Sequence, residues 1–172
     1  MAETKGQTRQ NVSWAIDNYA DMIRRICFLY LRRREDVEDV FQDVFLKYMQ
    51  RSEPFENADH EKAWLLRVAI NCCKDLLGSF WHNRILPLDD ELMAAVPAES
   101  HDLLDAVIKL PTNERAAIYL FYYEGYSVSE ISRIQNQKVN TIYSHLHRAR
   151  VRLGKRIGGL GLEYETDDKE SF

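Results

Sequence analysis

The spacing of the apolar residues most constrains the fold, because they recur every three or four positions along most of the chain and rarely alternate. This spacing gathers apolar side chains on one face of an α-helix, whereas a half-buried strand would alternate apolar and polar residues. The low counts of glycine and proline, 7 and 4 in 172 residues, agree with long helices. The sequence therefore predicts an all-α protein.

Three helices are predicted in the first half of the chain. Their apolar stripes lie within residues 13–34, 37–48 and 64–77. We expect Pro54 to break the second helix and Asp59 to cap the third. Gly78 is the expected stop of the third helix.

Between Leu86 and Ser100 the apolar periodicity fades, and prolines and acids take its place, so this segment is the best candidate for a linker. The sequence thus predicts two small helical domains joined by a flexible linker, since neither half is long enough for a large core. The predicted parts are a front domain at 12–85, the linker at 86–101, a rear domain at 102–157 and an acidic, disordered tail at 158–172.

The rear domain has the spacing of a helix-turn-helix motif. Ser127 and Glu130 match a capping box, residues 135–138 form a polar turn, and Asn140 is the expected cap of the last helix. Earlier in this domain, we expect Thr112 or Asn113 to cap a helix and Gly125 to end it. A plain helical hairpin with a basic exposed face would give a similar pattern, so that alternative stays open here.

Charges of opposite sign occupy different segments, although the net charge is only −4. Residues 35–43 carry five acids and no base, whereas residues 148–156 carry five bases and no acid. This segregation indicates different partners for the two segments. Solvated helix faces would explain either run taken singly.

Motifs of the common enzyme classes are absent from the sequence. There is no P-loop, dinucleotide-binding glycine loop, nucleophile elbow or HExxH zinc motif. The three cysteines lack the spacing of a metal or disulfide framework, and we expect Cys27 and Cys72 in the core. We therefore expect no catalysis, no cofactor and no metal.

No apolar run approaches the ~20 residues that span a bilayer, and the first residues lack the apolar stretch of a signal peptide. We therefore expect a cytoplasmic protein.

Four stretches, in order, resemble the extracytoplasmic-function (ECF) class of bacterial RNA polymerase sigma factors. The front half resembles the core-binding domain, and the rear half resembles the promoter-recognition domain. The stretches are REDVEDVFQDVFLKYM (34–49), AWLLRVAINCCKDLL (63–77), LPTNERAAIYLFYYEGYSVSEISRI (110–134) and NTIYSHLHRARVRL (140–153). The resemblance implies a sigma factor that binds core RNA polymerase and promoter DNA, both duplex and single-stranded, and that an anti-sigma protein regulates.

The resemblance also implies the residues of each interface. The implied polymerase-binding residues are Asp36, Asp39, Gln42, Asp43 and Phe45. For the melted promoter element they are Phe55, Asn57, Trp64, Arg67, Asn71 and Lys74. For the far, duplex element they are Thr141, Tyr143, Ser144, His147, Arg148 and Arg152.

The sequence also allows other roles for some of these residues and for the whole chain. Phe45 fits equally well as a plain core residue, and Trp64 fits better as a buried core tryptophan. Arg148 has a phosphate contact as its alternative to a base contact. The chain departs from the family pattern at Asn140, Tyr143 and His145, which leaves its promoter sequence open. A free-standing helix-turn-helix repressor is the main rival, although nothing resembles the dimer seam that such a protein normally needs.

Overall fold

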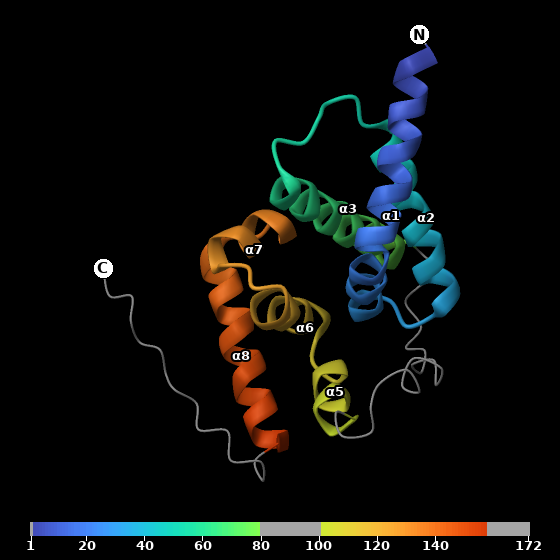
Figure 1. Cartoon of the computed structure of the whole chain (residues 1–172). Helices are drawn as coiled ribbons and strands as arrows, with labels where there is room; N and C mark the ends of the chain where they lie inside the picture. Colours follow the sequence, from blue (N-terminus) through green and yellow to red (C-terminus); the bar gives the residue numbers. More distant parts are fainter. Residues whose placement is uncertain (1, 80–100, 158–172) are drawn as a thin grey trace.

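The computed structural model describes residues 2–79 and 101–157, and all of its regular structure there is helical (Figure 1). The front half contains α1 (Ala2–Tyr30), α2 (Arg34–Gln50) and α3 (Ala58–Gly78). Each of these three helices packs against the other two. The all-α prediction is confirmed, while most of the predicted linker and the whole acidic tail lie outside the described residues.

The rear half consists of shorter helices arranged around one long helix. These are α5 (His101–Ile108), α6 (Thr112–Ile118), the π-helical turn η2 (Tyr119–Tyr123), α7 (Val128–Gln135) and α8 (Val139–Ile157). The last helix, α8, packs against α5, α6 and α7, so it forms the spine of this half (Figure 1).

Apolar stripes predicted from the sequence form the core. The predicted stripe includes Ile23 and Ile26 in α1 and Leu65 in α3, all of them 0% exposed. Burial of each such side chain contributes about 1.5–3 kcal/mol, so the front half depends on these contacts more than on helix propensity. Cys27, Cys72 and Cys73 are buried among them, as predicted for the first two.

Helix boundaries depart from the predictions where a cap was assigned to the wrong residue. Asn57, not Asp59, caps α3, and its side-chain oxygen accepts a hydrogen bond from the backbone N–H of His60 at 2.8 Å. Neither Thr112 nor Asn113 caps α6, because Pro111 occupies that position. Asn140 does not cap α8, which already begins at Val139. For α3 and α6 the residue at the cap position lies one or two residues before the predicted one.

Two left-handed residues end helices in the rear half. Gly125 has φ 75°, which a glycine adopts without steric cost, and it follows the π-helical turn as the predicted stop. Asn136 has φ 52° and ends α7. Because asparagine tolerates this conformation better than most residues, it lets the chain reverse within three residues before α8.

Front and rear halves touch through two pairs of helices, α3 with α7 and α1 with α6 (Figure 1). Their buried side chains join into one hydrophobic cluster that runs through both halves. Within the described ranges, no helix is long and apolar enough to cross a membrane.

Candidate polymerase and promoter interfaces

The second helix presents both carboxylates and large apolar side chains to solvent. Asp39, Gln42 and Asp43 are exposed, and Leu46 and Met49 are 53% and 46% exposed. Steps of three and four residues place all five on one side of the helix, which we call the α2 face. Such a face suits a partner that offers basic and apolar groups together.

An ion pair with α1 fixes the rotation of α2. Arg24 donates two hydrogen bonds to the Glu38 carboxylate, at 2.9 and 3.3 Å, and its guanidinium lies 4.0 Å from the centre of the Phe41 ring. The hydrogen bond from Arg24 holds the pKa of Glu38 below its ordinary value. This contact, with the buried valines of α2, determines which residues point to solvent.

The helix-turn-helix predicted in the rear half is present as α7, a turn and α8. Both hydrogen bonds of the capping box form: the Ser127 hydroxyl accepts from the N–H of Glu130, and the Glu130 carboxylate accepts from the N–H of Ser127 at 2.8 Å. The hydrogen bond from the Ser127 N–H, and a second one that the Ser127 hydroxyl donates to the carboxylate, lower the pKa of Glu130. The capping box therefore fixes the residue at which α7 begins.

One side of α8 is buried and the other is open to solvent. Ile142, Leu146 and Ala149 are at most 1% exposed. The open side begins with Thr141, which is half-buried, and we call it the α8 face. Its exposed members are Tyr143, Ser144, His147 and Arg148. Hydroxyls, an imidazole and a guanidinium at the start of a second helix are the groups that read base edges and phosphates in the major groove.

Aromatic rings gather where the loop at residues 51–57 meets α3. The Phe55 ring stacks on Tyr48, with centroids 5.7 Å apart and planes 22° from parallel, and it meets Trp64 edge-on at 5.5 Å. Phe55 and Trp64 are both half-buried. Half-exposed rings beside a basic helix face suit the stacking of single-stranded bases.

Comparison with known proteins gives the family. Residues 15–81 match the family model Sigma-70 region 2, and residues 100–153 match Sigma-70, region 4. The chain is 29% identical to the ECF RNA polymerase sigma factor SigM of Mycobacterium tuberculosis over 142 residues, covering 80% of this chain and 72% of SigM. It is 27% identical to the ECF sigma factor SigW of Bacillus subtilis over 168 residues, covering 84% of this chain and 88% of SigW. The chain belongs to the ECF sigma factors.

A sigma factor binds core RNA polymerase and directs it to promoters, so this chain is a transcription initiation factor. Solved structures support the fold. One is the sigma factor RpoE of Bartonella quintana in complex with the anti-sigma factor NepR, with a TM-score of 0.66 and 22% identity, covering 87% of this chain and 98% of that one. Another is CnrH in complex with the cytosolic domain of CnrY, with a TM-score of 0.61 and 20% identity, covering 88% and 90%.

Phe45 does not lie on the α2 face of this sigma factor. It is 5% exposed, and its ring packs 4.8 Å from that of Phe41. It follows Val44 in the buried stripe of α2, so its expected place at the polymerase interface was wrong and the core alternative holds. Asp36, half-buried at the start of α2, lies at the edge of the face rather than within it.

Arg152 forms an ion pair with another residue of the same chain. Its Nε lies 3.1 Å from a carboxylate oxygen of Glu114, a residue that is only 3% exposed. Nearby, Arg150 donates a 2.8 Å hydrogen bond to the hydroxyl of Tyr122. These arginines attach α8 to α6 and η2, so part of the basic run at 148–156 makes contacts within the protein. Arg148 stays exposed, and its Nε donates a 3.2 Å hydrogen bond to the Ser144 carbonyl one turn earlier in the same helix.

Of the three polar residues expected along the melted strand on α3, the structure leaves two open and covers one. Arg67 and Asn71 are exposed. Lys74 is half-buried, and its Nζ donates a 2.9 Å hydrogen bond to the backbone carbonyl of Gln135 in α7. Burial lowers the pKa of Lys74. The Lys74 amine is therefore bound to the rear half, and in this arrangement it is not free to contact single-stranded DNA. Asn57 likewise uses its side-chain oxygen as a cap.

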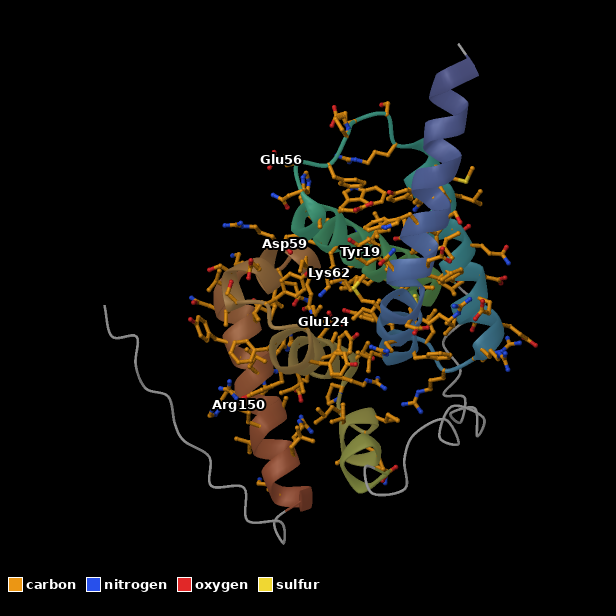
Figure 2. The ribbon with its side chains drawn as sticks, in the orientation of Figure 1. Tyr19, Glu56, Asp59, Lys62, Glu124 and Arg150 are labelled. Atoms are coloured by element: carbon orange, nitrogen blue, oxygen red, sulfur yellow. The ribbon has the colours of Figure 1, made fainter. Side chains whose placement is uncertain are left out.

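Polar contacts join the two halves of the sigma factor. Lys62 of α3 and Glu124, which follows η2, face each other across the contact, with Nζ 2.8 Å from a carboxylate oxygen (Figure 2). Arg25 of α1 donates a 2.8 Å hydrogen bond to the Tyr123 hydroxyl. The amide of Gln135 is fully buried there and has no hydrogen-bond partner among the described residues. Polar and incompletely satisfied contacts are typical of domain interfaces that open.

The sequence reasoning missed several residues of these surfaces. Leu46 and Met49 extend the acidic stripe by three- and four-residue steps from Gln42, and continuing the helical count past Asp43 would have found them. Lys62 carries no local sequence signal, because its partner Glu124 lies far away in the sequence.

Proposed function

We propose that the α2 face is the surface through which this sigma factor binds core RNA polymerase. The single observation that carries this assignment is that the face combines exposed Asp39, Gln42 and Asp43 with exposed Leu46 and Met49. Carboxylates attract a basic partner and fix its register, while the apolar side chains supply the area that desolvates on binding.

The α8 face is the proposed reader of the duplex promoter element. Arg148 is its main base contact, because arginine pairs bidentately with guanine more often than any other side chain does. Thr141, Tyr143, Ser144 and His147 add contacts to bases or phosphates. Arg152 is retained only as a residue that holds α8 in place.

The melted element is assigned to the loop at 51–57 and to α3. An unstacked base would be captured beside Phe55 and Trp64, and the strand would continue past Arg67 and Asn71. Lys74 joins this path only when α7 moves away, since its amine is bound to Gln135 in the closed arrangement.

The remaining proposals concern organisation and regulation. We retain the division into domains at 12–85 and 102–157 with a linker at 86–101. The chain performs no catalysis of its own, needs no cofactor, acts in the cytoplasm and is held inactive by an anti-sigma protein. Two similar folds, RpoE and CnrH, were solved with NepR and with the cytosolic domain of CnrY, which supports the last point.

Co-purification with bacterial core RNA polymerase tests the docking surface. The tagged chain should retain core polymerase on a column, and a variant with Leu46→Ser and Met49→Ser should retain much less while unfolding at the same temperature. The variant Val139→Ser and Val151→Ser, which shortens two exposed apolar side chains on α8 and not on the α2 face, is the matched control. Equal retention by all three proteins would contradict the assignment of the α2 face.

A further inference from the structure

We propose that Arg51 is a positioning residue, which holds Phe55 and Trp64 as a shelf for an unstacked promoter base. The inference rests on the proposed role of the loop at 51–57. It adds a residue that neither the sequence motifs nor the acidic, apolar and recognition surfaces described above include.

Arg51 lies over both rings of the shelf. Its guanidinium carbon is 4.6 Å from the centre of the Phe55 ring and 5.3 Å from that of Trp64. Its Nε also donates a 2.9 Å hydrogen bond to the backbone carbonyl of Glu53, within the same loop. One side chain therefore joins the loop backbone, the loop's aromatic residue and the first turns of α3.

Below the shelf, the rings rest on a fixed support. Glu61 is only 9% exposed, and its carboxylate accepts hydrogen bonds from Tyr48 at 2.5 Å and from Tyr19 at 3.5 Å. Burial, and then the bond to Glu61, raises the pKa of Tyr48, so its hydroxyl stays a donor. These three residues come from α1, α2 and α3, so the packing of the front half fixes them. The side of Phe55 that faces the loop needs a further contact to hold the ring in place.

Arg51 makes that contact. Its side chain is mostly buried, whereas an arginine that binds DNA phosphates would face solvent. Its side chain is 20% exposed, compared with 84% for Glu53, its neighbour in the loop. A planar guanidinium stacks on rings and still donates in its own plane, whereas a lysine amine offers only a point charge. The arginine should therefore act through Phe55 and Trp64 and not through direct contact with DNA.

The test uses holoenzyme assembled from the full chain and bacterial core RNA polymerase. The probe is a single-stranded DNA library with about ten randomised nucleotides, within the usual range of single-strand site sizes. Sequences retained by the wild-type holoenzyme are read out, and the most enriched one is labelled for anisotropy measurements. The variants are Arg51→Gln, Arg51→Lys, Phe55→Ala and the double variant Arg51→Gln with Phe55→Ala. The control Lys109→Gln removes the same charge from the exposed corner before α6.

We expect Arg51→Gln and Arg51→Lys to weaken binding roughly fivefold, which corresponds to about 1 kcal/mol for a cation–π contact. Lys109→Gln should bind as the wild type does, and all variants should bind core polymerase normally. The double variant should lose less affinity than the sum of the two single losses, because part of the effect of Arg51 passes through the Phe55 ring.

Three results would overturn the inference. Normal binding by Arg51→Lys would make the residue a simple charge. Additive losses in the double variant would make it an independent DNA contact. If Arg51→Gln weakened core-polymerase binding as much as it weakened DNA binding, the role of Arg51 would be structural. If the wild-type holoenzyme enriched no sequence from the library, the proposed single-strand function of the loop would itself be wrong.

Discussion

Lys62 on α3 and Glu124 after η2 form an ion pair across the contact between the two halves, with 2.8 Å between Nζ and the carboxylate. The Glu124 side chain is only 7% exposed, and it also accepts a 2.5 Å hydrogen bond from the Tyr119 hydroxyl. A buried carboxylate is costly without a partner of opposite charge, so Glu124 depends on Lys62. The pair therefore makes the closed arrangement sensitive to a single substitution.

Reversal of one charge in this pair should open the free protein. Hydrogen bonds that involve charged groups contribute about 1.5–3 kcal/mol, so Lys62→Glu should shift the population toward open forms by roughly tenfold or more. Small-angle X-ray scattering should record a larger radius of gyration. The swap Lys62→Glu with Glu124→Lys should restore the wild-type value, and Lys109→Glu should leave it unchanged. An unchanged radius in Lys62→Glu would show that the pair does not hold the halves together.

Charge reversal on the α2 face should weaken the complex with core polymerase. Asp39 and Asp43 are exposed and lie four residues apart on one face, so Asp39→Lys with Asp43→Lys replaces two attractive charges by repulsive ones. We expect a dissociation constant at least tenfold higher, with a larger effect at low salt because the charges are exposed. Titration of labelled chain with core polymerase measures it.

The same reversal at Asp17 and Asp21 is the control for that experiment. These acids are exposed on α1, also four residues apart, and are not members of the α2 face. If both double variants lost affinity equally, the effect would reflect net charge and the docking surface would be wrongly placed.

Substitution of Arg148 should separate base reading from phosphate binding. Arg148→Ala should weaken binding of the duplex promoter element by about 1–3 kcal/mol and relax sequence choice at one position, if the guanidinium contacts a base. Mobility-shift assays on a set of single-base promoter variants measure both effects. An equal loss on every sequence would instead make Arg148 a phosphate contact.

His145 should make the stability of the rear half depend on pH. Neither ring nitrogen has a hydrogen-bond partner among the described residues. Burial, and then the charge of Arg148, lowers the pKa of His145, although Glu114 acts the other way. The folded state therefore favours the neutral ring. Its stabilisation is complete above the unfolded pKa of about 6.5 and is lost as the pH falls through that value toward the lower folded one.

Thermal unfolding between about pH 7.5 and 5.5 checks this, because the interval brackets the ordinary histidine pKa. The wild type should lose more stability on acidification than His145→Gln does. His147→Gln, two residues away and exposed, should behave as the wild type. If both variants differed from the wild type by the same amount in the stability lost on acidification, His145 would not be the source of the pH dependence.

Apolar periodicity predicted the helices well, because burial dominates their stability and leaves a regular record in the sequence. Caps were harder to assign. Asn57 and Asp59 are both good cap residues two positions apart, and only the observed backbone decides between them. The π-helical turn at Tyr119–Tyr123 was not foreseen, because its residues also fit an ordinary helix.

Interfaces were predicted less completely than the helices. Asp39 on α2 and Arg148 on α8 are exposed, so both are accessible for the contacts that the family resemblance implied. Phe45 and Lys74 do not face solvent freely, because one packs in the core and the other binds α7. Their burial depends on contacts between segments far apart in the chain, which local spacing does not encode.

Run-off transcription with purified bacterial core RNA polymerase and a pool of genomic promoter fragments tests the central claim most directly. The account predicts new, defined start sites that need this chain, that share two upstream sequence elements, and that disappear with the Asp39→Lys and Asp43→Lys variant. Absence of transcription, together with absence of co-purification with core polymerase, would contradict the account and leave a helix-turn-helix protein with another partner.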